Sequence, residues 1–160
     1  MKPMYRGLLV AAVQCGIVLS LAGKYALDHA SLPRVWVRTT PVDPDSPLRG
    51  RYVRLRLALD GTVSAADRRH TPVRLSIIDG RLATQEDVSG SSLYMSCSGT
   101  RGCWLEQPVA FFIPEHVSDP SRVKSGEELW VEVSVPKDSY PRPVRLGVKQ
   151  YGMIRPLDVR

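Results

Sequence analysis

Residues 51–60, RYVRLRLALD, carry the clearest structural signal in the chain. Every second residue from Val53 to Leu59 is a large apolar one. Successive side chains of a β-strand point to opposite faces of its sheet, so this period of two predicts a strand with one buried face. The opposite face would carry Tyr52, Arg54 and Arg56. Asp60-Gly61 is typical of a turn that ends such a strand.

The same alternation recurs on both sides of this segment. It predicts strands at 35–37, 73–77, 129–135 and 144–148, a returning hairpin strand at 81–88 and a short final strand at 157–159. The continuous apolar run VAFFI at 109–113 is typical of a strand buried on both faces. Proline-rich loops are expected at 40–47 and 141–143. About seven or eight short strands predict an all-β fold, a single barrel or sandwich domain.

Only the N-terminal segment predicts a long helix. Residues 7–23, GLLVAAVQCGIVLSLAG, contain no charge and, with their flanks, reach the thickness of a membrane. We therefore expect a transmembrane anchor in 1–28 and an extracytoplasmic β domain in 29–160. Lys2 and Arg6 precede the run, so the positive-inside rule predicts a single-pass inner-membrane protein with a cytoplasmic N-terminus and a periplasmic domain. The alternative is a signal peptide cleaved before Gly23.

The composition excludes several classes of protein. The 160 residues are 43% hydrophobic and 24% charged, which excludes a disordered chain and a polytopic membrane protein. Lys2, Arg6 and Lys24 flank the apolar segment and account for half of the net charge of +6. The remaining excess is scattered along the chain, which does not indicate a nucleic-acid-binding protein.

A resemblance to a known family starts from residues 47–57, PLRGRYVRLRL. This segment resembles the signature of the GDYXXLXY proteins, membrane-anchored bacterial proteins named after that motif. It matches the signature at Gly50, Tyr52 and Leu55. It departs from the signature at two positions, with Arg51 in place of an Asp and Leu57 in place of the final Tyr.

A second element of that family is matched by residues 111–115, FFIPE, which include Pro114 and Glu115. The N-terminal apolar helix agrees with the family as well. The resemblance implies an envelope protein that works with a multi-spanning membrane partner, and it carries no established activity. Because Arg51 replaces an acidic residue, no role for an acidic group can be transferred to that position.

The cysteines are the next candidate for chemistry. Cys97 and Cys103 lie in CSGTRGC, and in an exported domain this spacing predicts a disulfide that closes a small loop. Free or intermolecular thiols, a redox pair and a metal site are the alternatives. Cys15 falls within the apolar run, where it is expected to pack as a small hydrophobic residue.

No catalytic, metal or cofactor site is predicted. The three histidines, His29, His70 and His116, share no spacing motif, and Glu115-His116 is more typical of a polar loop than of an acid–base pair. The arginines at 49, 51, 54 and 56 would form either a cationic stripe for anionic headgroups or glycans or an ordinary solvated face.

Two hypotheses for function follow. The first is a non-enzymatic interaction or accessory subunit of the envelope, anchored by its own helix and bound to an integral-membrane partner. The second is an envelope enzyme or ligand-binding module with a cleft near Tyr52, Arg54 and Glu115. The sequence leaves the oligomeric state open.

Overall fold

The computed structural model describes residues 3–42, 52–59, 68–87, 90, 92–99, 102–137 and 139–159. The chain divides into two compact units, Met1–Leu32 and Pro33–Arg160. The first unit is the helix α1, Pro3–Ser31. Its apolar stretch Tyr5–Leu27 has 23 residues and none of it is buried inside the protein. At about 1.5 Å per residue, this stretch is long and apolar enough to cross a membrane.

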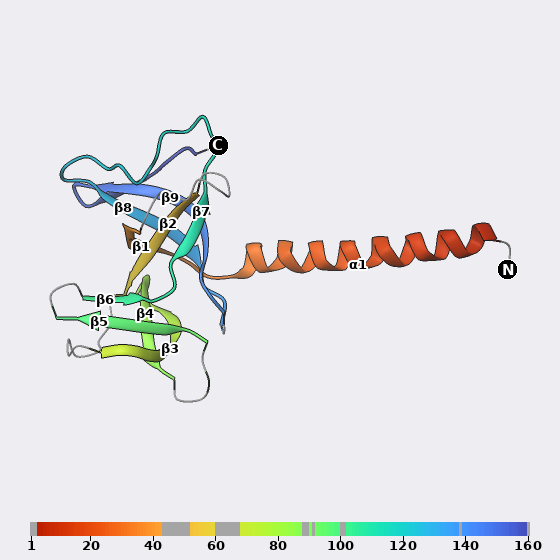
Figure 1. The fold of residues 1–160 in the computed structure, drawn as a ribbon, viewed down its shortest axis with the longest axis horizontal. Coiled ribbons are helices and arrows are strands. Elements are labelled where there is room, and N and C mark those ends of the chain that lie inside the picture. Colours follow the sequence, from red (N-terminus) through yellow and green to blue (C-terminus); the bar gives the residue numbers. More distant parts are fainter. Residues whose placement is uncertain are drawn as a thin grey trace. The chain divides into compact units, whose positions relative to one another are not determined.

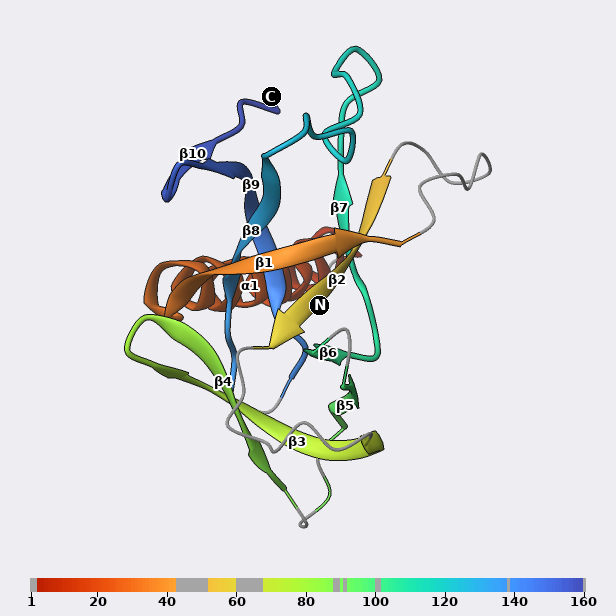
Figure 2. The same cartoon turned by 90° about the vertical axis from the view of Figure 1, so that its left-hand side faces the viewer.

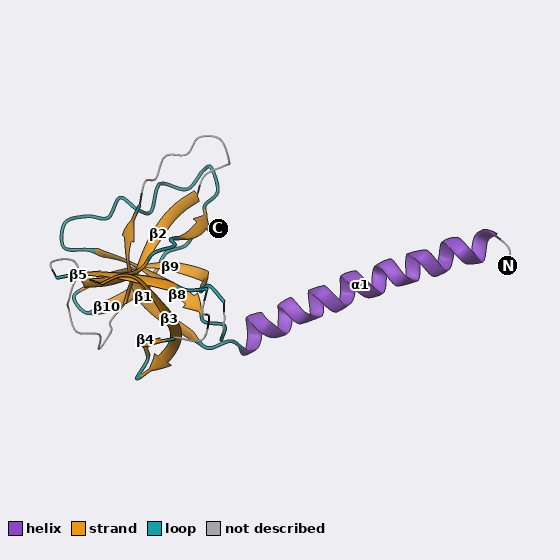
Figure 3. Ribbon diagram, turned by 60° about the horizontal axis from the view of Figure 1, so that its bottom comes forward, coloured by secondary structure: helices purple, strands orange, loops and turns teal. Residues whose placement is uncertain are grey.

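The second unit is built of strands, and the part that the structure describes holds no further helix (Figure 3). The strands are β1 (Arg34–Pro41), β2 (Tyr52–Leu59), β3 (Arg68–Ile78), β4 (Arg81–Glu86), β5 (Tyr94–Ser98), β6 (Gly102–Leu105), β7 (Val109–Phe112), β8 (Glu128–Ser134), β9 (Arg142–Gln150) and β10 (Met153–Pro156). All described pairings are antiparallel, in the order β10-β9-β8-β1-β2-β6-β5-β3-β4, with β7 also paired to β2. The sheet curls into a half-barrel (Figures 1 and 2). The predicted all-β class with one N-terminal helix is thereby confirmed.

Strand β2 is the centre of this sheet. One of its edges pairs with β1. The other edge pairs first with β7, from Tyr52 to Leu55, and then with β6, at Ala58 and Leu59. Pro108 lies between β6 and β7 and has no N–H to donate, which is consistent with the break between the two short strands. In Figure 1, strands β3–β6 therefore gather below one end of β2, whereas β1, β7, β8 and β9 lie around the rest of it.

The core forms from the apolar side of each alternating strand. In β2, Leu55 and Leu57 are completely buried, whereas Arg54 between them is exposed. The same alternation places Val35 and Val37 of β1 in the core. We call the side of the sheet opposite to this core the outward face.

Four local predictions are wrong. The loop expected at 40–47 starts later, because Thr40 and Pro41 pair with β2 at the end of β1; residues 43–47 lie outside the described residues. VAFFI is not buried on both faces: Ala110 is exposed and Phe112 is 71% exposed, because β7 pairs only with β2 at the rim of the half-barrel. Pro143 lies within β9, where it opposes Val133 beside a bulge that accommodates the missing donor. The final strand is Met153–Pro156, and residues 157–159 lie beyond it.

Candidate functional site

The three tryptophans of the chain all lie on the outward face of the sheet. Trp36, Trp104 and Trp130 alternate with core residues and are each half-buried. Each ring has a cationic side chain over it. Arg145 Cζ lies 6.0 Å from the centroid of Trp36, Arg56 Cζ 5.6 Å from that of Trp104, and Lys149 Nζ 4.4 Å from that of Trp130. The outward face therefore presents the residue types that dominate binding interfaces, aromatic rings and arginine.

Strand register brings this set together. Thr40 of β1 opposes Arg56 of β2, so their side chains share a face. Trp104 of β6 opposes Ala58 of β2 on one edge and Ser96 of β5 on the other. The outward face thus runs without interruption from β1 across β2 and β6 to β5.

The Trp36 ring packs directly on a glycine. Gly147 of β9 lies beneath it, and a Cβ at this position would come within 2.8 Å of Trp36 Cζ3 and 3.1 Å of the Arg155 carbonyl oxygen. No side chain fits in that space without moving the indole. Gly147 is thus required for the position of Trp36 on this face.

A cavity of about 570 Å³ opens where β1, β2 and β6 meet the segment before β8, and we call it the Trp104 pocket. Its lining combines arginine, threonine and carboxylate side chains with apolar ones: Arg38, Thr39, Thr40, Pro41, Arg56, Ala58, Cys103, Trp104, Val123, Glu127, Glu128 and Leu129. Arg56 Nε is buried and has no hydrogen-bond partner. The Nε–H of Arg56 is therefore shielded from solvent beside the pocket and lacks a protein acceptor.

The carboxylates of the same pocket already have donors. Glu127 accepts a hydrogen bond from the backbone N–H of Lys124 at 3.1 Å. Glu128 accepts one from Trp130 Nε1 at 3.1 Å and lies 3.8 Å from Arg38. Arg56 forms no ion pair with any carboxylate in the described part of the chain.

A second polar group lies on the same face, around the carboxylate of Glu106. Ser96 Oγ donates to Glu106 Oε1 at 2.7 Å, and the backbone N–H of His70 donates to the same oxygen at 2.9 Å. His70 Nδ1 lies 3.0 Å from Oε2, and its ring stacks on Tyr94 at 4.0 Å. His70 has a φ of 55°, a left-handed conformation that non-glycine residues rarely adopt. Contacts from both its backbone and its ring hold it there.

This arrangement stabilises the ionised form of Glu106. The hydrogen bond from Ser96 is the largest cause of a pKa below the usual 4.5; partial burial opposes it, and the hydrogen bonds and charge of His70 lower the pKa further. Both Ser96 and His70 are bound to the carboxylate, so the serine hydroxyl is not directed at the imidazole as a nucleophile–base pair requires. The contacts fix an exposed imidazole beside the carboxylate.

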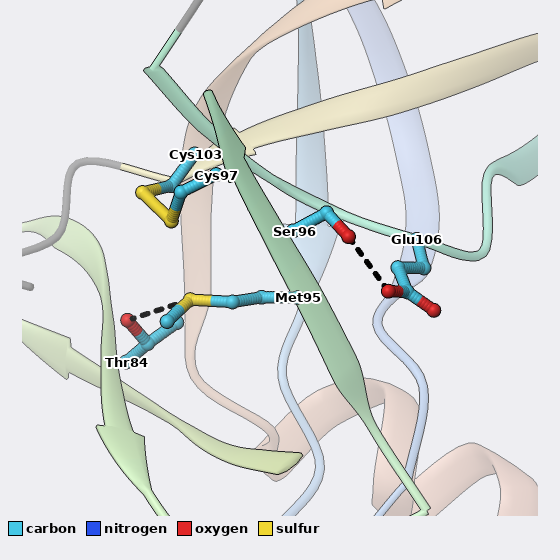
Figure 4. Close-up of a disulfide and its surroundings, with 6 residues drawn as sticks. All are labelled: Thr84, Met95, Ser96, Cys97, Cys103 and Glu106. Carbon is cyan, nitrogen blue, oxygen red and sulfur yellow. Dashed lines mark hydrogen bonds between the residues drawn. A yellow bond between two sulfur atoms is a disulfide. The ribbon is translucent and has the colours of Figure 1, made fainter. Parts of the chain in front are cut away.

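The disulfide lies on the opposite side of β5 from Ser96 and Glu106. Cys97 of β5 and Cys103 of β6 oppose each other, and their sulfur atoms are at bonding distance, 2.06 Å. Figure 4 shows the bond on one side of β5, with Met95, while Ser96 points to the other side and meets Glu106. The disulfide therefore joins the two strands that carry Ser96 and Trp104. Cys15 of α1 is a free cysteine.

The described family-motif residues occupy different surroundings. Gly50 and Arg51 lie outside the described residues. Tyr52 packs against Phe112 with ring centroids 6.0 Å apart. Leu55 is a core residue, and Pro114 and Glu115 follow β7 in a turn.

Neither of the two cavities described here is lined by Tyr52, Arg54 or Glu115, the residues of the predicted cleft. Tyr52, Arg54 and Glu115 do not line the Trp104 pocket, which forms around Arg56, two residues further along β2. A second cavity of about 520 Å³ includes Phe111 and Phe112 of β7 and Val144 of β9. In the described residues no group of three or more potential metal ligands occurs.

The sequence analysis did not identify Trp104 and Glu106 as site residues. One signal was available for the tryptophans: Trp36 and Trp130 occupy outward positions of alternating strands, where polar residues are expected. Glu106 carries no such signal, since its partner His70 is 36 residues away.

Comparison with known proteins gives one match. The family model described as GDYXXLXY protein matches residues 14–151. No curated protein and no solved structure matches the chain.

Proposed function

We propose that this chain, which belongs to the GDYXXLXY family, is a single-pass protein of the bacterial envelope whose β domain binds a partner outside the cytoplasm without catalysing a reaction. The family match covers most of the chain, including most of α1 and the strands up to β9. It confirms the resemblance seen at Tyr52 and Leu55. The role of the β domain rests on its surface.

The observation that carries the binding role is the row of cation–tryptophan pairs on the outward face. A partly exposed tryptophan under an arginine or lysine offers a large rigid contact area beside a charge, which is the composition of interface hot spots. Trp130 and Trp104 belong to one connected surface, because Glu128 contacts Trp130 and lines the pocket that also contains Trp104.

Two features support a membrane location for that interaction. The stretch Tyr5–Leu27 has no cover within the protein, so lipid or another transmembrane helix would have to bury it. The Cys97–Cys103 disulfide is stable in an oxidising compartment such as the periplasm. An integral-membrane partner could cover the apolar helix within the membrane and bind the outward face of the β domain.

Topology is tested with fusions and fractionation. Alkaline phosphatase fused after Arg160 should be active, and the chain should remain in the membrane pellet after carbonate washing. A soluble protein that begins at Gly23 would identify α1 as a cleaved signal and refute the anchor.

Partner binding is tested by crosslinking in intact cells. A photo-crosslinking amino acid in place of Trp130 should yield one dominant adduct with a multi-spanning membrane protein. The same group at Gln85, an exposed position of β4, is the matched control and should give no such adduct. Equal adducts from both positions, or none from Trp130, would contradict the proposed interface.

A further inference from the structure

We propose that two copies of the chain associate in the membrane through the face of α1 that carries Gln14, with the two Gln14 amides hydrogen-bonded to each other. This inference rests on the membrane anchor of the proposed function and assigns a partner to the helix rather than to the β domain. Three properties of the molecule support it: an unsatisfied amide near the middle of the membrane, an open helix surface beside it, and the parallel orientation that a membrane imposes on two copies.

The unsatisfied amide belongs to Gln14. The apolar run 7–23 holds two side chains with an amide or a hydroxyl group, Gln14 and Ser20. Ser20 Oγ donates to the Ile17 carbonyl oxygen at 3.0 Å, so the helix itself satisfies this group. Gln14 is exposed, and its amide has no hydrogen bond within the part of the chain that the structure describes. The middle of Tyr5–Leu27 is residue 16, two positions from Gln14, and lipid offers no hydrogen bonds at that depth. The amide therefore needs a donor and an acceptor from a neighbouring helix.

The surface beside Gln14 is open to a second helix. Gly7, Ala11, Val18 and Leu21 share a face with Gln14, because the five residues follow one another at spacings of four, three, four and three, and all five are exposed. This is the spacing with which two helices pack along a left-handed seam. A Cβ at Gly7 would meet no atom within 4 Å, and Ala11 has a small side chain. The backbone of a neighbouring helix can therefore come close to α1 on this face.

A second copy of the chain supplies the matching group at the right depth. Every copy inserts with the same orientation, because the same flanking charges direct it, so two α1 helices lie parallel. Identical residues then lie at the same depth, and Gln14 meets Gln14. A carboxamide contains both a donor and an acceptor, so two such side chains satisfy each other reciprocally across a two-fold axis. An unrelated helix would need its own polar group at this depth, whereas a second copy always has one.

The opposite face of α1 lacks this requirement. It carries the small residues Ala12, Gly16 and Gly23, which would also allow close packing. Its polar neighbour Ser20 is already satisfied by the Ile17 carbonyl oxygen. The amide of Gln14 therefore distinguishes one face from the other.

The first test measures self-association of the full-length protein in liposomes of phosphatidylethanolamine and phosphatidylglycerol. Donor and acceptor dyes are attached enzymatically after Arg160, and energy transfer is followed as lipid is added. Gln14→Leu removes the amide and keeps the helix apolar enough to insert, so it should weaken association about three- to thirtyfold. Gln14→Asn keeps an amide and should retain most of the association. Ser20→Ala is the matched control and should associate as wild type does, because Ser20 is satisfied within its own helix.

The second test identifies the face by cysteine crosslinking in membranes. In a Cys15→Ala background, Val18→Cys should form a disulfide-linked dimer on oxidation. Leu19→Cys is the matched control: it lies one residue further, at nearly the same depth but about 100° around the helix, and should not crosslink.

The proposal is overturned if energy transfer stays at the level of unassociated molecules, if Gln14→Leu weakens association less than about threefold, or if Ser20→Ala weakens it as much as Gln14→Leu does. Equal crosslinking of Val18→Cys and Leu19→Cys would overturn it as well. None of these outcomes affects photo-crosslinking at Trp130. The mass of the purified protein shows whether α1 is retained, so loss of the anchor and failure of helix pairing are distinguishable.

Discussion

Breaking the Cys97–Cys103 disulfide should lower the melting temperature of the β domain by about 9 °C. The bond joins residues six positions apart and closes a loop of about seven residues. In the chain-entropy model such a loop contributes about 2.3 kcal/mol to the free energy of unfolding. A domain of about 130 residues unfolds with an entropy of about 270 cal/mol/K, which converts this loss into the expected shift.

The assay is thermal unfolding of the full-length protein in detergent, followed by circular dichroism. Cys97→Ala/Cys103→Ala removes the bond, and reduced wild type removes it while keeping both sulfur atoms. The comparison separates the crosslink from the packing of the buried Cys97 side chain. Cys15→Ala is the matched control and should not shift the transition, because Cys15 is free in the helix.

The reasoning is refuted if reduction shifts the transition by less than about 2 °C. It is refuted equally if both cysteines react with iodoacetamide in freshly isolated membranes without a reductant. Either result would return the pair to the free-thiol, redox or metal alternatives.

Two further predictions concern the outward face. Gly147→Ala should lower the free energy of unfolding, measured in urea, by about 1–3 kcal/mol, because the new Cβ would collide with Trp36. Gly16→Ala is the control: this glycine lies in open space on the helix, so the free energy of unfolding of the β domain should not change. Glu106 has a pKa below 4.5 in the folded state, so its charge stabilises the domain above that pH and the stabilisation is lost as the pH falls through the folded pKa. Glu106→Gln should therefore flatten the acid side of the stability–pH curve. An unchanged slope in Glu106→Gln would refute the role of its charge.

The fold was predictable wherever burial has a simple period. Strand β2 shows this most clearly: the predicted segment 51–60 became Tyr52–Leu59, with the predicted faces. The helix was equally clear from its uninterrupted apolar run. Strands β5 and β6 were not predicted, because YMSCS and GCWL are short and their small residues hide the alternation. Phe112 was misplaced because burial of an apolar run depends on how many neighbours its strand acquires, which the run itself does not encode.

The site was less predictable than the fold for a physical reason. Arg56 was identified as an outward cation, but its cavity depends on Trp104 and Glu127, which approach it only through strand register and loop packing. The Glu106 group likewise joins His70 and Ser96 from separate strands. Residues that meet only through long-range pairing leave no local pattern for a single sequence to reveal.

The short pairing between β2 and β6 has a consequence for the response of the domain to temperature. In the described residues, β2 meets β6 at only two residue pairs, Ala58–Trp104 and Leu59–Cys103. Strands β3–β6 are hydrogen-bonded among themselves, but they join the other strands mainly through the shared core that contains Leu57 and Met95. Hydrophobic association weakens on cooling, so this junction should loosen in the cold before either group of strands loses its own pairing.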